Sequence, residues 1–138
     1  MIVLDTNVLS ELLRPAPATQ VEAWLGRQDS DAIFFTTIGE AELRYGVAIL
    51  PIGKKRTTLE AAIQGMMDDD FRDRILACDR DAARAYSTIA AERRAAGRPI
   101  SHFDCQIAAI TRAHGGKLAT RNAKDFEGCG LIVIDPWR

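Results

Sequence analysis

Short apolar runs alternate along this sequence with longer segments in which apolar residues recur every three or four positions. The runs at residues 2–4, 33–36, 117–120 and 131–134 are continuous, and residues 74–78 form a weaker fifth run. Continuous apolar runs separated by helical segments are typical of strands in a parallel sheet that is covered on both faces. The pattern therefore predicts an α/β fold.

The segments between these runs have the spacing and the stop signals of helices. Arg14-Pro15 ends the first one, because the residue before a proline is driven out of the helical region, and glycines end the later ones. Phe103, Ile107 and Ile110 are spaced as core-facing residues of the last helix. We expect helices at residues 7–13, 19–26, 40–50, 56–67, 82–93 and 103–110.

The length and composition indicate one globular domain that spans residues 1–138. No repeat or linker divides the chain, and its 47% hydrophobic and 27% charged residues argue against disorder, collagen and coiled coil. The chain starts without a basic leader and has no run of about 18 apolar residues. We therefore expect a cytoplasmic protein without a membrane partner.

The cysteine, histidine and glycine content narrows the chemistry. Three cysteines, none in a C-x-x-C pair, and two histidines exclude a disulfide framework, a zinc site and a histidine-rich metal site. A divalent cation would therefore have oxygen ligands. The glycine-rich motifs of dinucleotide and P-loop nucleotide enzymes are absent as well.

The net charge of −1 does not by itself indicate a nucleic-acid partner. Basic residues do cluster at Lys54-Lys55-Arg56 and at Arg93-Arg94 with Arg98. Solvated helix ends and loops are the more usual explanation of such clusters.

Ligands of open parallel sheets bind outside the carboxyl ends of the strands, where this chain places acids and hydroxyls. Asp5 closes the first strand, and its alternative role is to cap the helix that follows. Glu42 interrupts an apolar stripe formed by Ile38, Tyr45 and Ile49. A carboxylate on an inward face costs several kcal/mol unless it is paired or bound to a cation, so we favour a functional role over an arginine ion pair.

Other acids have a structural explanation. Glu40 and Asp104 each stand three residues after a hydroxyl residue, Thr37 and Ser101, in the spacing of a capping box. For Asp125, near a cap at Asn122, capping is the preferred interpretation. A parallel sheet would nevertheless allow Asp5, Glu42 and Asp104 to face one crevice. Their mutual repulsion would be relieved by Mg²⁺ or Mn²⁺, and such an ion suits phosphodiester hydrolysis.

At these residues the chain resembles PIN-domain proteins of the VapC toxin type, and more closely their FitB branch. The likeness covers essentially the full length, in residues 2–8, 41–46, 104, 119–126 and 135–137. It implies a three-layer α/β/α sandwich around a parallel sheet and an endoribonuclease dependent on Mg²⁺ or Mn²⁺. Carried over by position, Asp5 and Asp104 match the principal metal ligands, Glu42 matches the third acid, and Thr6 and Thr120 match small polar residues that line the site.

The chain departs from this family at Asn122, where a fourth acid is common. Asp125 is the residue that would replace this acid. Without it, the site has one carboxylate fewer with which to bind a second metal ion. The resemblance also implies a homodimer and a VapB-like antitoxin whose C-terminal segment places an arginine among the acids. Promoter DNA would be bound only through the antitoxin. From the clustering of basic residues alone, we further expect that a dimer frames the RNA groove with two copies of Lys54-Lys55-Arg56 and Arg93-Arg94.

Two other functions compete with an RNA-cleaving toxin. An aspartyl-phosphate phosphatase would use Asp5 as its nucleophile, but it would require a second acid at the position of Asn7. A weakly catalytic or non-catalytic partner in an antitoxin-containing, DNA-binding regulatory complex is the stronger alternative, because Asn122 contributes no charge.

Overall fold

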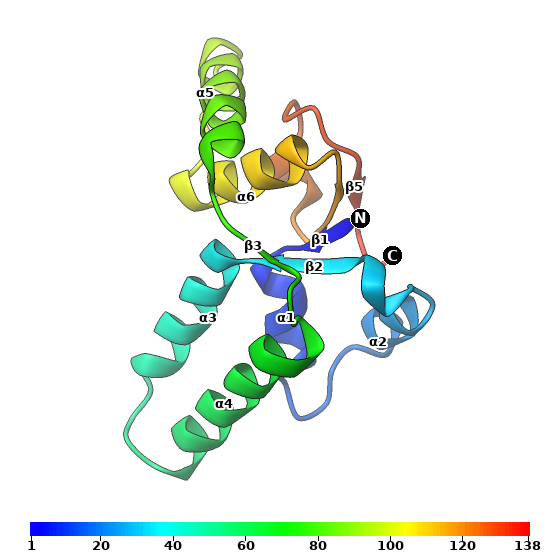
Figure 1. The fold of residues 1–138 in the computed structure, drawn as a ribbon, viewed down its shortest axis with the longest axis vertical. Helices are drawn as coiled ribbons and strands as arrows, with labels where there is room; N and C mark the ends of the chain where they lie inside the picture. The colour runs from blue at the N-terminus through cyan, green and yellow to red at the C-terminus, as the bar shows by residue number, and fades with distance from the viewer.

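The computed structural model describes residues 1–138, with a five-stranded sheet at the centre (Figure 1). All strand pairings are parallel, and the order is β3-β2-β1-β4-β5. The first strand of the chain therefore lies in the middle, between partners from distant parts of the sequence. The strands are β1 (Ile2–Leu4), β2 (Ile33–Thr36), β3 (Ile75–Leu76), β4 (Lys117–Ala119) and β5 (Val133–Ile134).

Helices cover both faces of this sheet, so the expected three-layer α/β/α sandwich is confirmed (Figure 1). One face carries α1 (Thr6–Leu12), α2 (Thr19–Gly26), α3 (Thr37–Ala48) and α4 (Lys54–Gly65), and the other carries α5 (Arg80–Ala95) and α6 (His102–Ala113). Short helices η1 (Ser30–Ala32), η2 (Met66–Asp70) and η3 (Ala123–Phe126) complete the fold.

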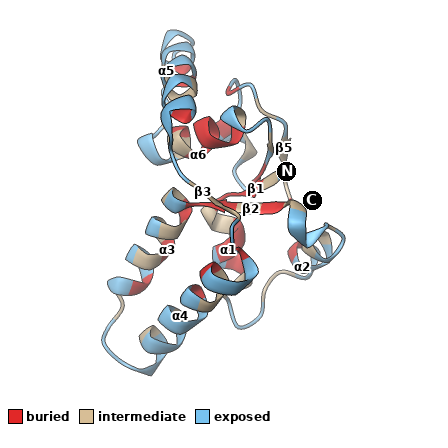
Figure 2. Ribbon diagram, in the orientation of Figure 1, coloured by how far each residue is buried: buried red, intermediate tan, exposed pale blue.

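Each face of the sheet has its own hydrophobic core, and buried residues follow the sheet and the helix faces against it (Figure 2). The neighbours Val3 and Leu4 belong to opposite cores, because successive side chains of a strand point to opposite faces. This is why the strands are continuously apolar in the sequence. No helix has the length and apolar character needed to cross a membrane.

The N-cap of α3 differs from the one expected from the sequence. Thr36, not Thr37, is the N-cap, and its hydroxyl accepts a hydrogen bond from the Gly39 amide at 2.9 Å. Glu40 instead pairs with Arg44 at 2.7 Å. A Cβ on Gly39 would lie 2.5 Å from the Phe35 ring, so the first turn of α3 rests directly on β2.

The apolar stripe expected to run past Glu42 meets the core only at Ile38 and is wrong for its other two members. Tyr45 and Ile49 are 68% and 65% exposed, whereas Leu43 and Val47 are buried. The face of α3 that packs on the sheet is set by the close approach at Gly39, which rotates the expected stripe toward solvent. Glu42 itself is half-buried beside α1.

Phe103 is likewise not a core residue, since it is 55% exposed. Helix α6 contributes to the core only from Cys105 onward, and His102 and Phe103 in its first turn are exposed. The spacing from Phe103 to Ile107 is helical as expected, but the first member of the stripe has no layer to pack against.

Arg93 is buried and therefore does not line the expected basic groove. Its guanidinium donates to the carbonyl oxygens of Arg98, Asp125 and Glu127 at 2.6, 2.7 and 2.9 Å. Arg93 therefore fastens the end of α5 to the segment around η3. In the other cluster, the Arg56 side chain pairs with Glu60 at 2.8 Å.

Candidate active site

Asp5 stands at the end of the central strand and is almost fully buried, with 5% of its surface exposed. One carboxylate oxygen, Oδ1, accepts a hydrogen bond from the Thr6 amide at 2.8 Å, so Asp5 caps α1 as predicted. The other, Oδ2, accepts from the Thr120 hydroxyl at 2.8 Å and from the Asn7 side-chain amide at 3.2 Å. The carboxylate is therefore rigidly oriented.

Thr120 joins this network from the end of the neighbouring strand. Its hydroxyl accepts hydrogen bonds from the Asn7 side chain at 3.2 Å and from the Asn122 backbone amide at 3.1 Å. The Asn7 carbonyl oxygen Oδ1 accepts from the Arg121 amide at 3.3 Å. Because β1 and β4 are adjacent and parallel, residues separated by more than a hundred positions meet at one edge of the sheet.

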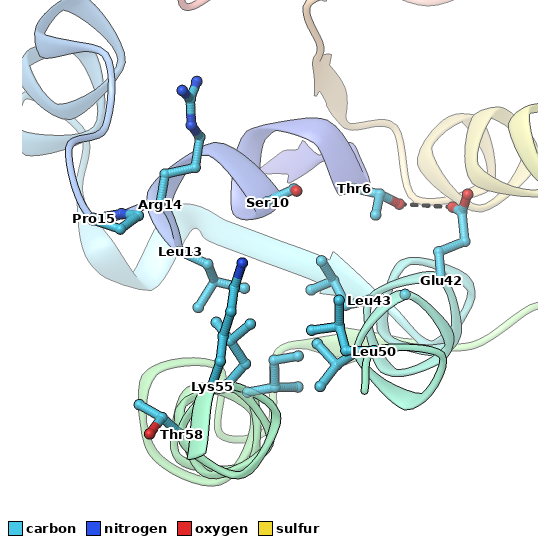
Figure 3. A pocket seen from close by; sticks show the side chains of 14 residues that line it. Thr6, Ser10, Leu13, Arg14, Pro15, Glu42, Leu43, Leu50, Lys55 and Thr58 are labelled. Atoms are coloured by element: carbon cyan, nitrogen blue, oxygen red, sulfur yellow. Dashed lines mark hydrogen bonds between the residues drawn. The ribbon is translucent and has the colours of Figure 1, made fainter. Parts of the chain in front are cut away.

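Glu42 enters from α3 and contacts α1. The Thr6 hydroxyl donates to Glu42 Oε1 at 2.7 Å, and both residues lie at the edge of a cavity between α1, α3 and α4 (Figure 3). The cavity has a volume of about 650 Å³. Leu43 and Leu50 belong to its apolar wall, and Lys55 reaches it from α4 (Figure 3).

The electrostatics bring Asp104 into the same site. The pKa of Asp5 is raised from 3.8 to about 6. Burial is the largest cause, hydrogen bonds from Thr120 and Thr6 oppose the rise, and the negative charges of Asp104 and Glu42 add to it. Burial likewise raises the pKa of Asp104, and the charge of Asp125 adds to that effect. The acids thus interact across the site and disfavour one another's ionised forms.

The donor set suits a hydrated hard cation rather than a closed cage. No three Asp, Glu, His or Cys side chains lie close enough to bind one ion together. Mg²⁺ is usually held by one or two carboxylates and keeps several waters, which the oxygen-only surroundings of Asp5 permit. The side chains therefore fit one hydrated divalent ion at Asp5, with Glu42 and Asp104 within its electrostatic reach.

The sequence model of the PIN domain matches residues 2–128 of this chain. The chain belongs to the PIN-domain family. It is 41% identical over 137 residues to the VapC ribonuclease Y4jK of Sinorhizobium fredii, covering 99% of this chain and 98% of that protein. It is 38% identical over 137 residues to the toxin FitB of Neisseria gonorrhoeae, covering 99% of each.

A solved structure of FitAB bound to an IR36 DNA fragment superposes on this PIN domain with a TM-score of 0.94. The two chains are 37% identical, and the match covers 100% of this chain and 96% of the other. These likenesses extend over the whole chain, so the predicted resemblance to VapC-type PIN proteins, with FitB among them, is confirmed.

Asn122 and Asp125 take different places around this PIN-domain site. Asn122 precedes η3, but its side chain makes no capping hydrogen bond, which corrects the expected cap. Asp125 lies within η3, where Arg93 binds its carbonyl oxygen and its charge raises the pKa of Asp104. Asp125 is therefore coupled to Asp104 rather than placed beside Asp5.

Asn7 is the site residue that the sequence reasoning undervalued. From the sequence alone, Asn7 counts only as a residue that lacks a carboxyl group. In the structure its side-chain amide joins Asp5, Thr120 and the Arg121 backbone. Its position three residues after a buried strand, in the first turn of a helix, is the signal that points to such a bridge. An aspartyl-phosphate phosphatase would need an acid at the position of Asn7 to protonate the leaving group. The Asn7 amide cannot do this, so the site does not favour that class of enzyme.

Proposed function

We propose that this PIN-domain protein is the toxin of a toxin–antitoxin module and hydrolyses RNA phosphodiester bonds with Mg²⁺ or Mn²⁺. The observation that carries the proposal is the Asp5 carboxylate, which is buried at the end of β1 and has its pKa raised to about 6. A carboxylate that burial and neighbouring charges disfavour gains strongly from a divalent cation. The relatives named VapC ribonuclease and toxin FitB support the same chemistry.

In this proposal Asp5 holds the ion, and Glu42 and Asp104 act on it through its waters. Such an ion lowers the pKa of bound water and neutralises charge that develops on a phosphoryl group. The Thr120 hydroxyl and the Asn7 amide orient Asp5, and the Thr6 hydroxyl orients Glu42. These neighbours fix the carboxylates before substrate binds, which is the usual role of groups just outside a metal site.

The partner in this proposal is a VapB-like antitoxin, as the FitAB complex suggests. The cavity between α1, α3 and α4 begins at Thr6 and Glu42 and has largely apolar walls, which suits an antitoxin segment. An arginine from that segment would replace the cation among the acids, because a guanidinium is a planar cation that binds carboxylates through two hydrogen bonds. We also propose a homodimer, alone or within a larger toxin–antitoxin assembly.

The proposal is tested by incubating the purified protein with structured RNAs in Mg²⁺, Mn²⁺ or EDTA, and by inducing it in cells with and without the adjacent small open reading frame. We expect metal-dependent cleavage and growth arrest that the neighbouring gene product relieves. Asp5→Asn should abolish both effects, whereas Asp69→Asn, at an exposed acid on η2, should preserve them. Cleavage that persists in EDTA or in Asp5→Asn would refute the mechanism.

A second candidate is a weakly catalytic or non-catalytic PIN-domain subunit of an antitoxin-containing complex that binds promoter DNA. The uncharged Asn122 and the similarity to FitAB on DNA favour it. This candidate predicts operator binding by the complex, measured by gel shift, that Asp5→Asn leaves intact. It further predicts no RNA cleavage by the wild-type protein in any divalent metal.

A further inference from the structure

Two aromatic side chains form an unusual pair at the junction of α5 and α6. The Tyr86 hydroxyl and His102 Nδ1 are joined by a hydrogen bond of 2.5 Å, and the two ring planes differ by 8°. Because the planes are nearly parallel and joined by that bond, they are at most about 2.5 Å apart, less than the contact distance of stacked rings. The rings therefore lie edge to edge, with centroids 6.4 Å apart, and form one flat plate.

This plate is open to solvent and has a third ring beside it in the sequence. His102 is exposed, Tyr86 is half-exposed, and their hydrogen bond lies on the surface. Phe103, the next residue along α6, is 55% exposed although the sequence pattern predicts a core position. Exposed aromatic rings of this kind are the surfaces on which unpaired nucleobases stack.

One ring of the plate, that of His102, belongs to the same turn of α6 as Asp104. Ser101 caps α6 by accepting a hydrogen bond from the Asp104 amide at 3.3 Å, which places His102, Phe103 and Asp104 in one turn. The charge of Asp104 in turn raises the pKa of Asp5.

We infer that Tyr86, His102 and Phe103 form a base-stacking platform for an unpaired nucleotide of single-stranded RNA at the edge of the acid site. The inference rests on the proposed ribonuclease function and specifies how its substrate is held. Within the plate, His102 positions the Tyr86 ring through its hydrogen bond, and the face of the joined rings receives the base.

A protein interface is the other use of exposed aromatic rings, and the observations favour it less. Phe103 is the single large apolar residue exposed on α6, whereas Tyr45, Ile49 and Ile52 gather on α3 and the loop after it. The centre of a protein interface is a contiguous apolar patch. A flat plate with a hydroxyl and imidazole nitrogens in its plane is instead matched to the face of a nucleobase.

The test measures binding of a fluorescein-labelled single-stranded RNA that contains 2-aminopurine, in Mg²⁺, by protein that also carries Asp5→Asn to prevent cleavage. We expect Tyr86→Ala and Phe103→Ala to weaken binding about 5- to 100-fold and to reduce the quenching of 2-aminopurine that stacking causes. Phe103→Trp should retain both. The control Ile52→Ala, at a residue that is 93% exposed in the loop between α3 and α4, should bind as its parent does.

Three results would overturn the inference. Equal binding by Phe103→Ala, Tyr86→Ala and their parent would exclude the platform and leave the proposed function standing. A change of oligomeric state in Phe103→Ala, measured by light scattering, would assign the surface to a protein partner. If the parent binds no single-stranded RNA and the wild-type chain cleaves none, the proposed function fails and the platform fails with it.

Discussion

The buried Asp5 carboxyl should make the stability of the metal-free protein depend on pH in an unusual direction. Its pKa is 3.8 in the unfolded chain and about 6 in the folded one, so the folded state binds this proton more tightly. Protonation therefore stabilises the fold, and the free energy of unfolding falls as pH rises through the range between these two values. Acids that are paired or hydrogen-bonded in the folded state, and whose pKa is thereby lowered, have the opposite effect.

The magnitude follows from the two pKa values. One pKa unit corresponds to about 1.4 kcal/mol, so the Asp5 contribution falls by about 3 kcal/mol between full protonation and pH values above 6. Asp5→Asn removes the titrating group. The variant also loses or rearranges hydrogen bonds, but that loss does not change with pH. The difference in free energy of unfolding between wild type and Asp5→Asn should therefore fall by about 2 kcal/mol or more from pH 4 to pH 7.5.

The assay is urea unfolding followed by circular dichroism, for both proteins, in EDTA at half-unit steps of pH. Taking the difference at each pH cancels the titration of groups that the two proteins share. Adding Mg²⁺ at pH 7.5 should stabilise the wild type through ligand binding to the folded state and should leave Asp5→Asn nearly unaffected.

A pH-independent difference between the two proteins would refute the reasoning, because it would mean that Asp5 ionises as freely in the fold as in water. A difference that grows in favour of the wild type as pH rises would show that its hydrogen bonds outweigh its burial. Equal stabilisation of the wild type and Asp5→Asn by Mg²⁺ would show that Asp5 is not a ligand of the metal ion.

Three further predictions concern neighbouring residues. Thr120→Val removes the hydroxyl hydrogen bond that lowers the pKa of Asp5. The acid limb of the pH–activity profile should therefore move to higher pH, and Mg²⁺ affinity should fall about tenfold or more. A profile that does not move would contradict this role of Thr120. Gly39→Ala should lower the free energy of unfolding by about 1–3 kcal/mol, because the added methyl group would overlap the Phe35 ring. Gly46→Ala is the control in the same helix: it has open space around it and should be neutral or stabilising by up to about 1 kcal/mol. Arg93→Met should cost about 3 kcal/mol in urea unfolding, and Arg93→Lys less, since the variant leaves three carbonyl oxygens without their cationic donor; equal stability would contradict the clamp.

The parts of the fold that follow from local chemistry were predictable from the sequence. Ile2, Val3 and Leu4 are apolar without alternation because both faces of β1 are covered, which indicates a central parallel strand. Asp5 and Thr120 follow two such strands, and the carboxyl ends of parallel strands meet at one edge. Their proximity could be expected without coordinates.

The parts that depend on rotation or on layer boundaries were not predictable. The stripe at Tyr45 and Ile49 has the right period, but the period does not say which face meets the sheet, and the contact at Gly39 decides that. Phe103 has core spacing in a turn that extends past the core. Arg93 has the composition of a surface cluster, and only the return of the chain around η3 gives it three carbonyl partners.

The hydrogen bond between Asp5 and Thr120 joins two residues that lie 115 positions apart along the chain. Until β4 leaves the exit tunnel, β1 lacks one of its two neighbouring strands, and the Asp5 carboxylate lacks the Thr120 hydroxyl that orients it. A nascent chain that has not yet reached β4, or a chain terminated before it, therefore cannot assemble this site, so under the proposed function the polysome is not exposed to the protein's activity before that point.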